Sequence, residues 1–139
     1  MYEDATIMVI DDIQDSLKRG AEELRMAERL VGISLPVAAS RAYIAGENLA
    51  YAAARKMHGS TSRDHAKVWK AVRELYEKGD LSRDYRPMLE EIYRLRVKGD
   101  YGRDVGGEEV ELSRKAVEEH IADLKEFMKE VLKLFGRKR

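Results

Sequence analysis

The chain has 139 residues, enough for one domain with a hydrophobic core, and we expect a single domain over 1–139 with its core at about 11–135. It has no cysteine, which excludes disulfide bonds and thiolate metal sites and favours a cytoplasmic location. Its 26 basic and 26 acidic residues cancel, which argues against a strongly basic, general nucleic-acid binder. No apolar run reaches the ~18–20 residues of a membrane span, and no signal-peptide-like segment opens the chain.

The first predicted helix runs from about Asp11 to Val31 and ends at Gly32. Its apolar residues recur at helical spacing and form one stripe, consisting of Ile13, Leu17, Ala21, Leu24, Ala27 and Val31. Residues 4–10 include the run ATIMVI, which is compatible with a short strand. We expect this segment instead to be a frayed or extended start to the first helix.

The second predicted helix runs from Pro36, which suits a first helical turn, to Met57. Its side chains are small on nearly every side of the helix, because it contains Ala38, Ala39, Ala42, Ala45, Ala50, Ala52, Ala53 and Ala54. A helix without bulky side chains lets its neighbours approach closely. We therefore expect it to lie at the centre of the fold.

Three more helices follow. The third is expected to begin at a capping box formed by Thr61 and Asp64 and to stop at Gly79. Its apolar residues are Val68, Trp69, Val72, Leu75 and Tyr76. The fourth is expected from Ser82 to Lys98, although Pro87, which fits only a first turn, also agrees with a later start. The fifth follows Gly106 and Gly107, and its apolar residues step by four and three: Val117, Ile121, Leu124, Met128, Val131 and Phe135.

These periodic segments, joined by short loops, predict an all-α fold. The architecture that we expect is an up-and-down antiparallel four-helix bundle with an additional shorter helix.

The end of the fourth helix carries the most informative pattern. Arg96 falls on the same helical stripe as the apolar Tyr85, Leu89 and Ile92. A buried charge without a partner is costly, so we expect Arg96 to be largely buried and paired with Asp100, four residues on, or with Glu47. The alternative is an ordinary helix end with a satisfied arginine, followed by a glycine-rich turn.

Three stretches resemble the HEPN domains, and in particular a stand-alone prokaryotic branch of them. They are the helix end LSRDYRPMLEEIYRLRVKGDYG, the alanine-rich SRAYIAGENLAYAAARKMHG, and HGSTSRDHAKVW followed by YEKGDLS. Their order and spacing carry the resemblance, which covers roughly residues 11–135. It implies a HEPN-like helical bundle and a homodimer.

The resemblance also implies a chemistry. HEPN ribonucleases are characterised by an arginine followed four to six residues later by a histidine, and they cleave RNA without a metal at a dimer interface. Histidine would move the 2′-hydroxyl proton and arginine would stabilise the developing phosphorane charge. Here Arg96 is followed by Asp100 and Tyr101, so tyrosine stands where histidine is expected. With an ordinary pKa near 10, tyrosine is a poor general base near neutral pH, although it can hydrogen-bond or stack on a base.

Three function classes therefore remain open. We favour a binding and regulatory module, the HEPN partner of a small nucleotidyltransferase in a toxin–antitoxin-like pair. It would bind RNA or a nucleotide through Arg96, Tyr101 and Arg103, with Arg96, Asp100 and Tyr101 as the candidates for any catalysis. The alternatives are a diverged metal-independent RNA endonuclease and a purely structural helical interaction domain. No cofactor, metal or membrane is expected.

Other candidate residues have simpler interpretations. His65 is expected to be a packed, hydrogen-bonded histidine, and the spacing of Arg114 and His120, ~120° apart on a helix, is interpreted as chance. The basic residues of the fourth helix are interpreted as a solvated face, and Glu108, Glu109 and Glu111 as helix-dipole partners of the fifth. Three leucines of the fifth helix, Leu112, Leu132 and Leu134, lie off its main apolar stripe. They favour a second apolar contact surface on this helix, as in a dimer.

Overall fold

The computed structural model consists of five helices, and no strand occurs among the residues it describes, which are 2–58, 64–101 and 113–136. Side chains are described for residues 12–58, 64–94 and 113–136. The helices are α1 (Tyr2–Leu30), α2 (Leu35–His58), α3 (His65–Glu77), α4 (Arg86–Tyr101) and α5 (Arg114–Gly136). The predicted all-α class is confirmed. No helix of this described part is long and apolar enough to cross a membrane.

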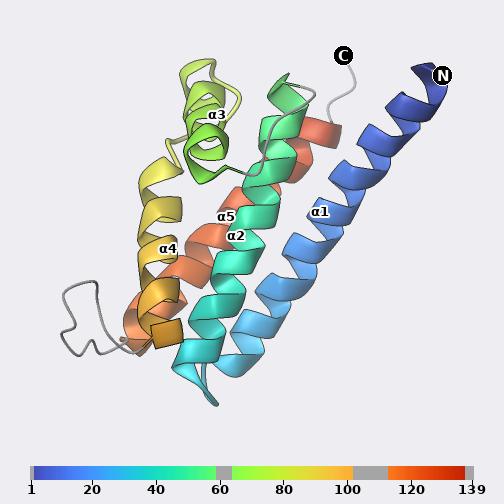
Figure 1. Cartoon of the computed structure of the whole chain (residues 1–139). Coiled ribbons are helices and arrows are strands. Elements are labelled where there is room, and N and C mark those ends of the chain that lie inside the picture. Colours follow the sequence, from blue (N-terminus) through green and yellow to red (C-terminus); the bar gives the residue numbers. More distant parts are fainter. Residues whose placement is uncertain (1, 59–63, 102–112, 137–139) are drawn as a thin grey trace.

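The helices pack as a bundle around α2 (Figure 1). α1 and α2 are antiparallel neighbours, and the short α3 lies at the C-terminal end of α2. α4 and α5 run in opposite directions, and α5 passes behind α2 and also contacts α1. α2 contacts each of the other four helices. All eight of its alanines named above are buried, so the predicted central position of this helix is confirmed.

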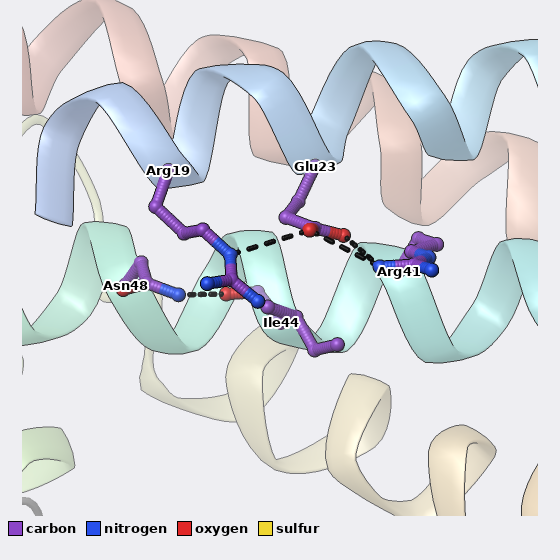
Figure 2. A network of polar contacts seen from close by, with 5 residues as sticks. All are labelled: Arg19, Glu23, Arg41, Ile44 and Asn48. Carbon is purple, nitrogen blue, oxygen red and sulfur yellow. Dashed lines mark hydrogen bonds and ion pairs between the residues drawn. The ribbon is translucent and has the colours of Figure 1, made fainter.

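Helices α1 and α2 approach each other most closely at Gly20. A Cβ atom added there would lie 2.9 Å from the side chain of Leu49, so only glycine fits without a shift. One turn further, the buried carboxylate of Glu23 accepts hydrogen bonds from Arg19 on its own helix and from Arg41 on α2 (Figure 2). Two guanidinium groups thus offset the cost of burying this charge.

Two helix boundaries differ from prediction. α1 begins at Tyr2 rather than near Asp11, so both the frayed start and the strand interpretation of residues 4–10 are wrong. α4 continues past Lys98 and through Gly99 to Tyr101. A glycine inside a helix costs only about 1 kcal/mol relative to alanine, which neighbouring turns can absorb. The apolar run of residues 4–10 suits a helix as well as a strand, since short apolar runs do not distinguish them.

The start of α3 also corrects the sequence analysis. The helix begins at His65, and Asp64 is itself the N-cap, since its carboxylate accepts a hydrogen bond from the Ala66 N–H at 2.9 Å. The capping box that starts at Thr61 is therefore wrong, and Thr61 lies outside the described residues. Past its C-terminus, Gly79 takes the left-handed conformation (φ 86°) that glycine adopts without strain.

α4 takes the later of the two starts, at Arg86, with Pro87 in its first turn. The Asp84 carboxylate accepts a hydrogen bond from the Arg86 N–H at 3.0 Å. The predicted stripe of Tyr85, Leu89 and Ile92 is buried. The apolar face of α4 therefore packs against α2.

The apolar face of α5 differs slightly from the predicted stripe. Val117, Ile121, Leu124 and Val131 are buried, but Phe127 and Leu134 join them, while Met128 and Phe135 are only partly buried. A helix has 3.6 residues per turn, so a strict 3.5-residue repeat drifts around its axis. Because Leu134 belongs to the core, it does not widen the outer apolar face. Leu132 remains exposed, and Leu112 lies outside the described residues.

Glu130 of α5 anchors the start of α4. Its carboxylate accepts hydrogen bonds from the Ser82 N–H (2.7 Å), the Ser82 hydroxyl (2.8 Å) and the hydroxyl of buried Tyr85. Burial acts to raise the pKa of Glu130, but the hydrogen bonds from Tyr85 and Ser82 outweigh it, and the pKa is lowered. Burial, with the contact to Glu130, raises the pKa of Tyr85 to about 12, so this hydroxyl stays a donor at neutral pH.

We expect Glu130→Gln to lower the free energy of unfolding by about 1–2 kcal/mol at pH 7, because hydrogen bonds to a charged acceptor become bonds to a neutral one. The pKa of Glu130 is lower in the folded than in the unfolded chain. Its contribution is therefore complete above the ordinary pKa of 4.5 and is lost as the pH falls below it. Urea titrations from pH 7 to pH 3 should show the two proteins converging in stability. Glu126→Gln, an exposed glutamate on the same helix, is the control. A difference that stays constant with pH contradicts the assignment.

Candidate functional site

The residues predicted to form the site occupy the last turns of α4. Arg96, Asp100 and Tyr101 all belong to this continuous helix, but their side chains lie outside the described residues, as does Arg103 altogether. The burial of Arg96 and its pairing with Asp100 or Glu47 therefore stay predictions. Their place on the backbone is defined: Arg96 follows Tyr93 by three residues and Ile92 by four, which is one helical turn.

Tyr93 belongs to a cluster of polar and aromatic side chains from three helices. Its centre is His65, in the first turn of α3, whose Nε2 lies 2.5 Å from the hydroxyl of Tyr43 and 3.2 Å from Oε2 of Glu47. Tyr43 and Glu47 are one turn apart on α2, and the Tyr43 hydroxyl donates to the same Oε2 at 2.7 Å. Three groups thus meet within hydrogen-bonding distance.

Counting protons assigns the donors in this trio. The single hydroxyl proton of Tyr43 points to the Glu47 carboxylate, which can only accept. Nε2 of His65 must then carry a proton, because it faces two oxygens that have no other proton to offer it. The trio is satisfied with Tyr43 and His65 donating and Glu47 accepting. Among the described residues no donor reaches the second carboxylate oxygen of Glu47, Oε1.

Aromatic rings surround His65. Trp69, one turn along α3, stacks on it with ring centroids 5.4 Å apart and planes at 12°. The ring of Tyr93 from α4 lies 5.1 Å from His65 and 5.9 Å from Trp69, edge to face with the indole. His65 and Trp69, together with Tyr43, Glu47 and the apolar Val68, Leu89 and Ile92, line a small hollow between α2, α3 and α4. The expectation that His65 is packed and hydrogen-bonded is confirmed.

The basic residues of the fourth helical segment are largely neutralised where they are described. Arg83 pairs with Asp123, Arg86 with Glu90 and Arg94 with Glu91. These pairs are surface pairs, consistent with the predicted solvated face. Glu108, Glu109 and Glu111 lie outside the described residues, and α5 opens instead at Arg114, with Ser113 accepting a hydrogen bond from the Ala116 N–H.

The other two histidines of the chain lie elsewhere. His58, at the end of α2, is 4.0 Å from Glu74. His120 of α5 lines a small cavity with Ala39, Ala42, Ile92 and Val117, and its buried Nδ1 has no hydrogen-bond partner among the described residues. Burial lowers the pKa of His120, against the nearby charge of Glu91. Arg114, the residue six positions before it, is exposed and paired with Glu118, so the two do not form a pair.

The cluster around His65 was only partly foreseen in the sequence. Tyr43 and Glu47, like His65 and Trp69, are four residues apart on a helix, and this spacing indicates contact within each pair. The meeting of the two pairs with Tyr93 depends on how three helices cross, which no local spacing encodes. Within the described part of the chain, no group of three or more potential ligands is placed to hold a metal ion.

Comparison with known proteins adds no family assignment: no family model matches the chain, and no curated protein is similar enough to count as a relative. The HEPN resemblance therefore depends on the motifs of this sequence alone.

Tyr43→Phe tests the hydrogen bonds of the cluster. The variant keeps the buried ring but removes the hydroxyl that joins Glu47 to His65, so we expect the free energy of unfolding to fall by about 1–2 kcal/mol in urea titrations. Tyr76→Phe on α3, where the tyrosine is exposed, should change it by less than about 0.5 kcal/mol. Equal effects of the two substitutions would show that the cluster adds no stability.

Proposed function

We propose that the chain is a HEPN-type binding and regulatory module that pairs with a small nucleotidyltransferase and binds RNA or a nucleotide without efficient cleavage. The observation that carries the proposal is the course of α4. This helix runs unbroken from the hollow lined by Leu89 and Ile92 through positions 96, 100 and 101. The motif positions thus lie one to two turns from Tyr93 and its aromatic cluster. A cation and a ring that can stack on a base, placed on one helix, suit recognition of single-stranded RNA.

The histidines favour binding over cleavage. The chain contains three, His58, His65 and His120, and all three are among the described residues. None lies on α4. His65 is engaged by Tyr43 and Glu47, and His120 faces an apolar cavity. No described histidine is therefore on α4 to act as the general acid or base. Position 101, where the HEPN motif has histidine, holds a tyrosine, whose ordinary pKa near 10 makes it a weak base at neutral pH.

The assembly is part of the same proposal. The HEPN resemblance implies a homodimer, and the exposed Leu132 on α5 is consistent with an apolar contact there. An up-and-down bundle of the HEPN type, with α3 as the shorter helix, fits the antiparallel course of the helices in Figure 1. The nucleotidyltransferase partner is proposed from the resemblance alone.

Tyr101→His is the test. The unmodified chain should bind a labelled single-stranded RNA, measured by fluorescence anisotropy, and cleave it slowly or not at all. Restoring histidine should raise the cleavage rate by up to ~10²–10⁴, the usual contribution of general acid–base help, and Arg96→Ala added to Tyr101→His should abolish the gain. Tyr76 is an exposed tyrosine on α3, so Tyr76→His is the control for adding a surface histidine.

The other function classes give different results. Cleavage by the unmodified chain at a rate that Tyr101→His does not increase would identify it as an endonuclease that does not need a histidine at 101. Absence of RNA binding and of cleavage in both forms, with no association with a nucleotidyltransferase, would identify a structural interaction domain.

A further inference from the structure

We infer that His120 is a pH-sensitive joint between α4 and α5. When its ring gains a second proton, the packing of α5 against Ile92 loosens and the last turns of α4 open away from the bundle. The features that carry the inference are a buried ring nitrogen without a partner, an apolar cavity beside the ring and sparse contact between the two helices. The joint does not depend on RNA binding, but its effect on the motif of α4 rests on the proposed function.

His120 lies where three helices meet. It lines a cavity of about 10 Å³, which is close to the least that one water molecule needs. The other lining residues are Ala39 and Ala42 of α2, Ile92 of α4 and Val117 of α5. None of these four side chains has a polar atom, so the walls of the cavity cannot stabilise a charge by hydrogen bonding.

Protonation of His120 is hindered at one particular nitrogen. Of the two ring nitrogens, only Nδ1 is both buried and without a hydrogen-bond partner among the described residues. A neutral imidazole carries one proton, whereas the charged ring carries a proton on each nitrogen. A proton on Nδ1 would be a buried donor with no acceptor, so the neutral ring is accommodated best with its proton on Nε2. The second proton must therefore enter at the buried nitrogen.

Charged groups on α4 and α5 act on His120 from both sides. Glu91 on α4, with Glu119 and Asp123 on α5, favours the protonated ring. Arg94 on α4 opposes it, and α2 contributes only alanines to the cavity. Glu91 and Asp123 each pair with an arginine, which offsets part of their charge. Burial has the largest effect, and it lowers the pKa of His120 from the ordinary 6.5.

The direction of the pH effect follows from this lowered pKa. An open form, in which water reaches Nδ1, takes up the proton more readily than the closed form. Between the lowered pKa and 6.5, each unit by which the pH falls therefore shifts the equilibrium toward the open form by up to about tenfold. Above 6.5 the ring is neutral in both forms, and the joint stays closed.

The opening is confined to one end of α4. At the other end, the carboxylate of Glu130 holds Ser82 and Tyr85, and its pKa, lowered from 4.5, keeps it ionised while His120 takes up its proton. Contact between α4 and α5 is sparser than the contact of either helix with α2. Arg96 follows Ile92 by one turn of a continuous helix. Loosening the contact at Ile92 therefore moves the turn that carries the motif.

Amide hydrogen exchange at pH 7.5 and pH 5.5 tests the joint. After correction for the intrinsic effect of pH on exchange, protection of the amides from Ile92 to Tyr101 should fall about three- to tenfold at pH 5.5. Protection from Leu17 to Ala27, in the part of α1 that packs on α2, should change by less than about twofold. Long-range proton–nitrogen spectra should show the Nε2–H tautomer of His120 at pH 7.5.

His120→Leu removes the titrating group and suits the apolar walls of the cavity. We expect protection at the end of α4 to be the same at both pH values in this variant. His58 is an exposed histidine at the end of α2, so His58→Gln is the control and should leave the fall in protection unchanged. Circular dichroism verifies that the variants are folded. If His120→Leu does not fold, His120→Gln, which does not titrate either, takes its place.

Equal protection of the unmodified chain at both pH values would overturn the inference. So would the same fall in the folded His120 variant, or a fall spread evenly over α1 and α4. None of these measurements contains RNA. Failure of the chain to bind RNA would therefore overturn the proposed function and leave the joint standing.

Discussion

The close packing of the alanine-rich α2 against every other helix is the constraint on which this structure depends. Alanines occupy much of the buried face of α2, so its neighbours supply much of the bulk there, as Leu24, Leu89 and Phe127 do. The neighbours can do so only at short range. Gly20 marks the limit of this approach, since no Cβ fits between α1 and Leu49. Close approach in turn brings the few polar residues of α2 into contact with their partners.

Those polar residues divide between two faces of α2. Arg41 pairs across to α1, where Glu23 also holds Arg19 (Figure 2). Tyr43 and Glu47 face α3 and α4 and hold His65. The first group joins two helices and pairs one carboxylate with two guanidinium groups. The second joins α2 to α3 and α4 around the ring of His65.

Sequence reasoning predicted the helical class and the central α2 well, because both depend on residue types repeated over many positions. It failed where one residue decides: Gly99 did not end α4, and Asp64 rather than Thr61 capped α3. The pairing of Arg96 with Asp100 or Glu47 stays a prediction, and the described contacts of Glu47 are with Tyr43 and His65. Local spacing indicates which residues share a helix face, but the angles at which helices cross decide which faces meet.

The site at the end of α4 and the cluster at His65 are best understood together. α4 is fixed at its start by Glu130, which holds Ser82 and Tyr85, and along its length by Leu89 and Ile92 on α2. A rigid helix transmits that placement to its last turns, so positions 96 and 101 are held at a set distance from Tyr93. The packing that fixes the start and the middle of α4 therefore also sets where the motif positions at its end lie relative to the cluster around His65.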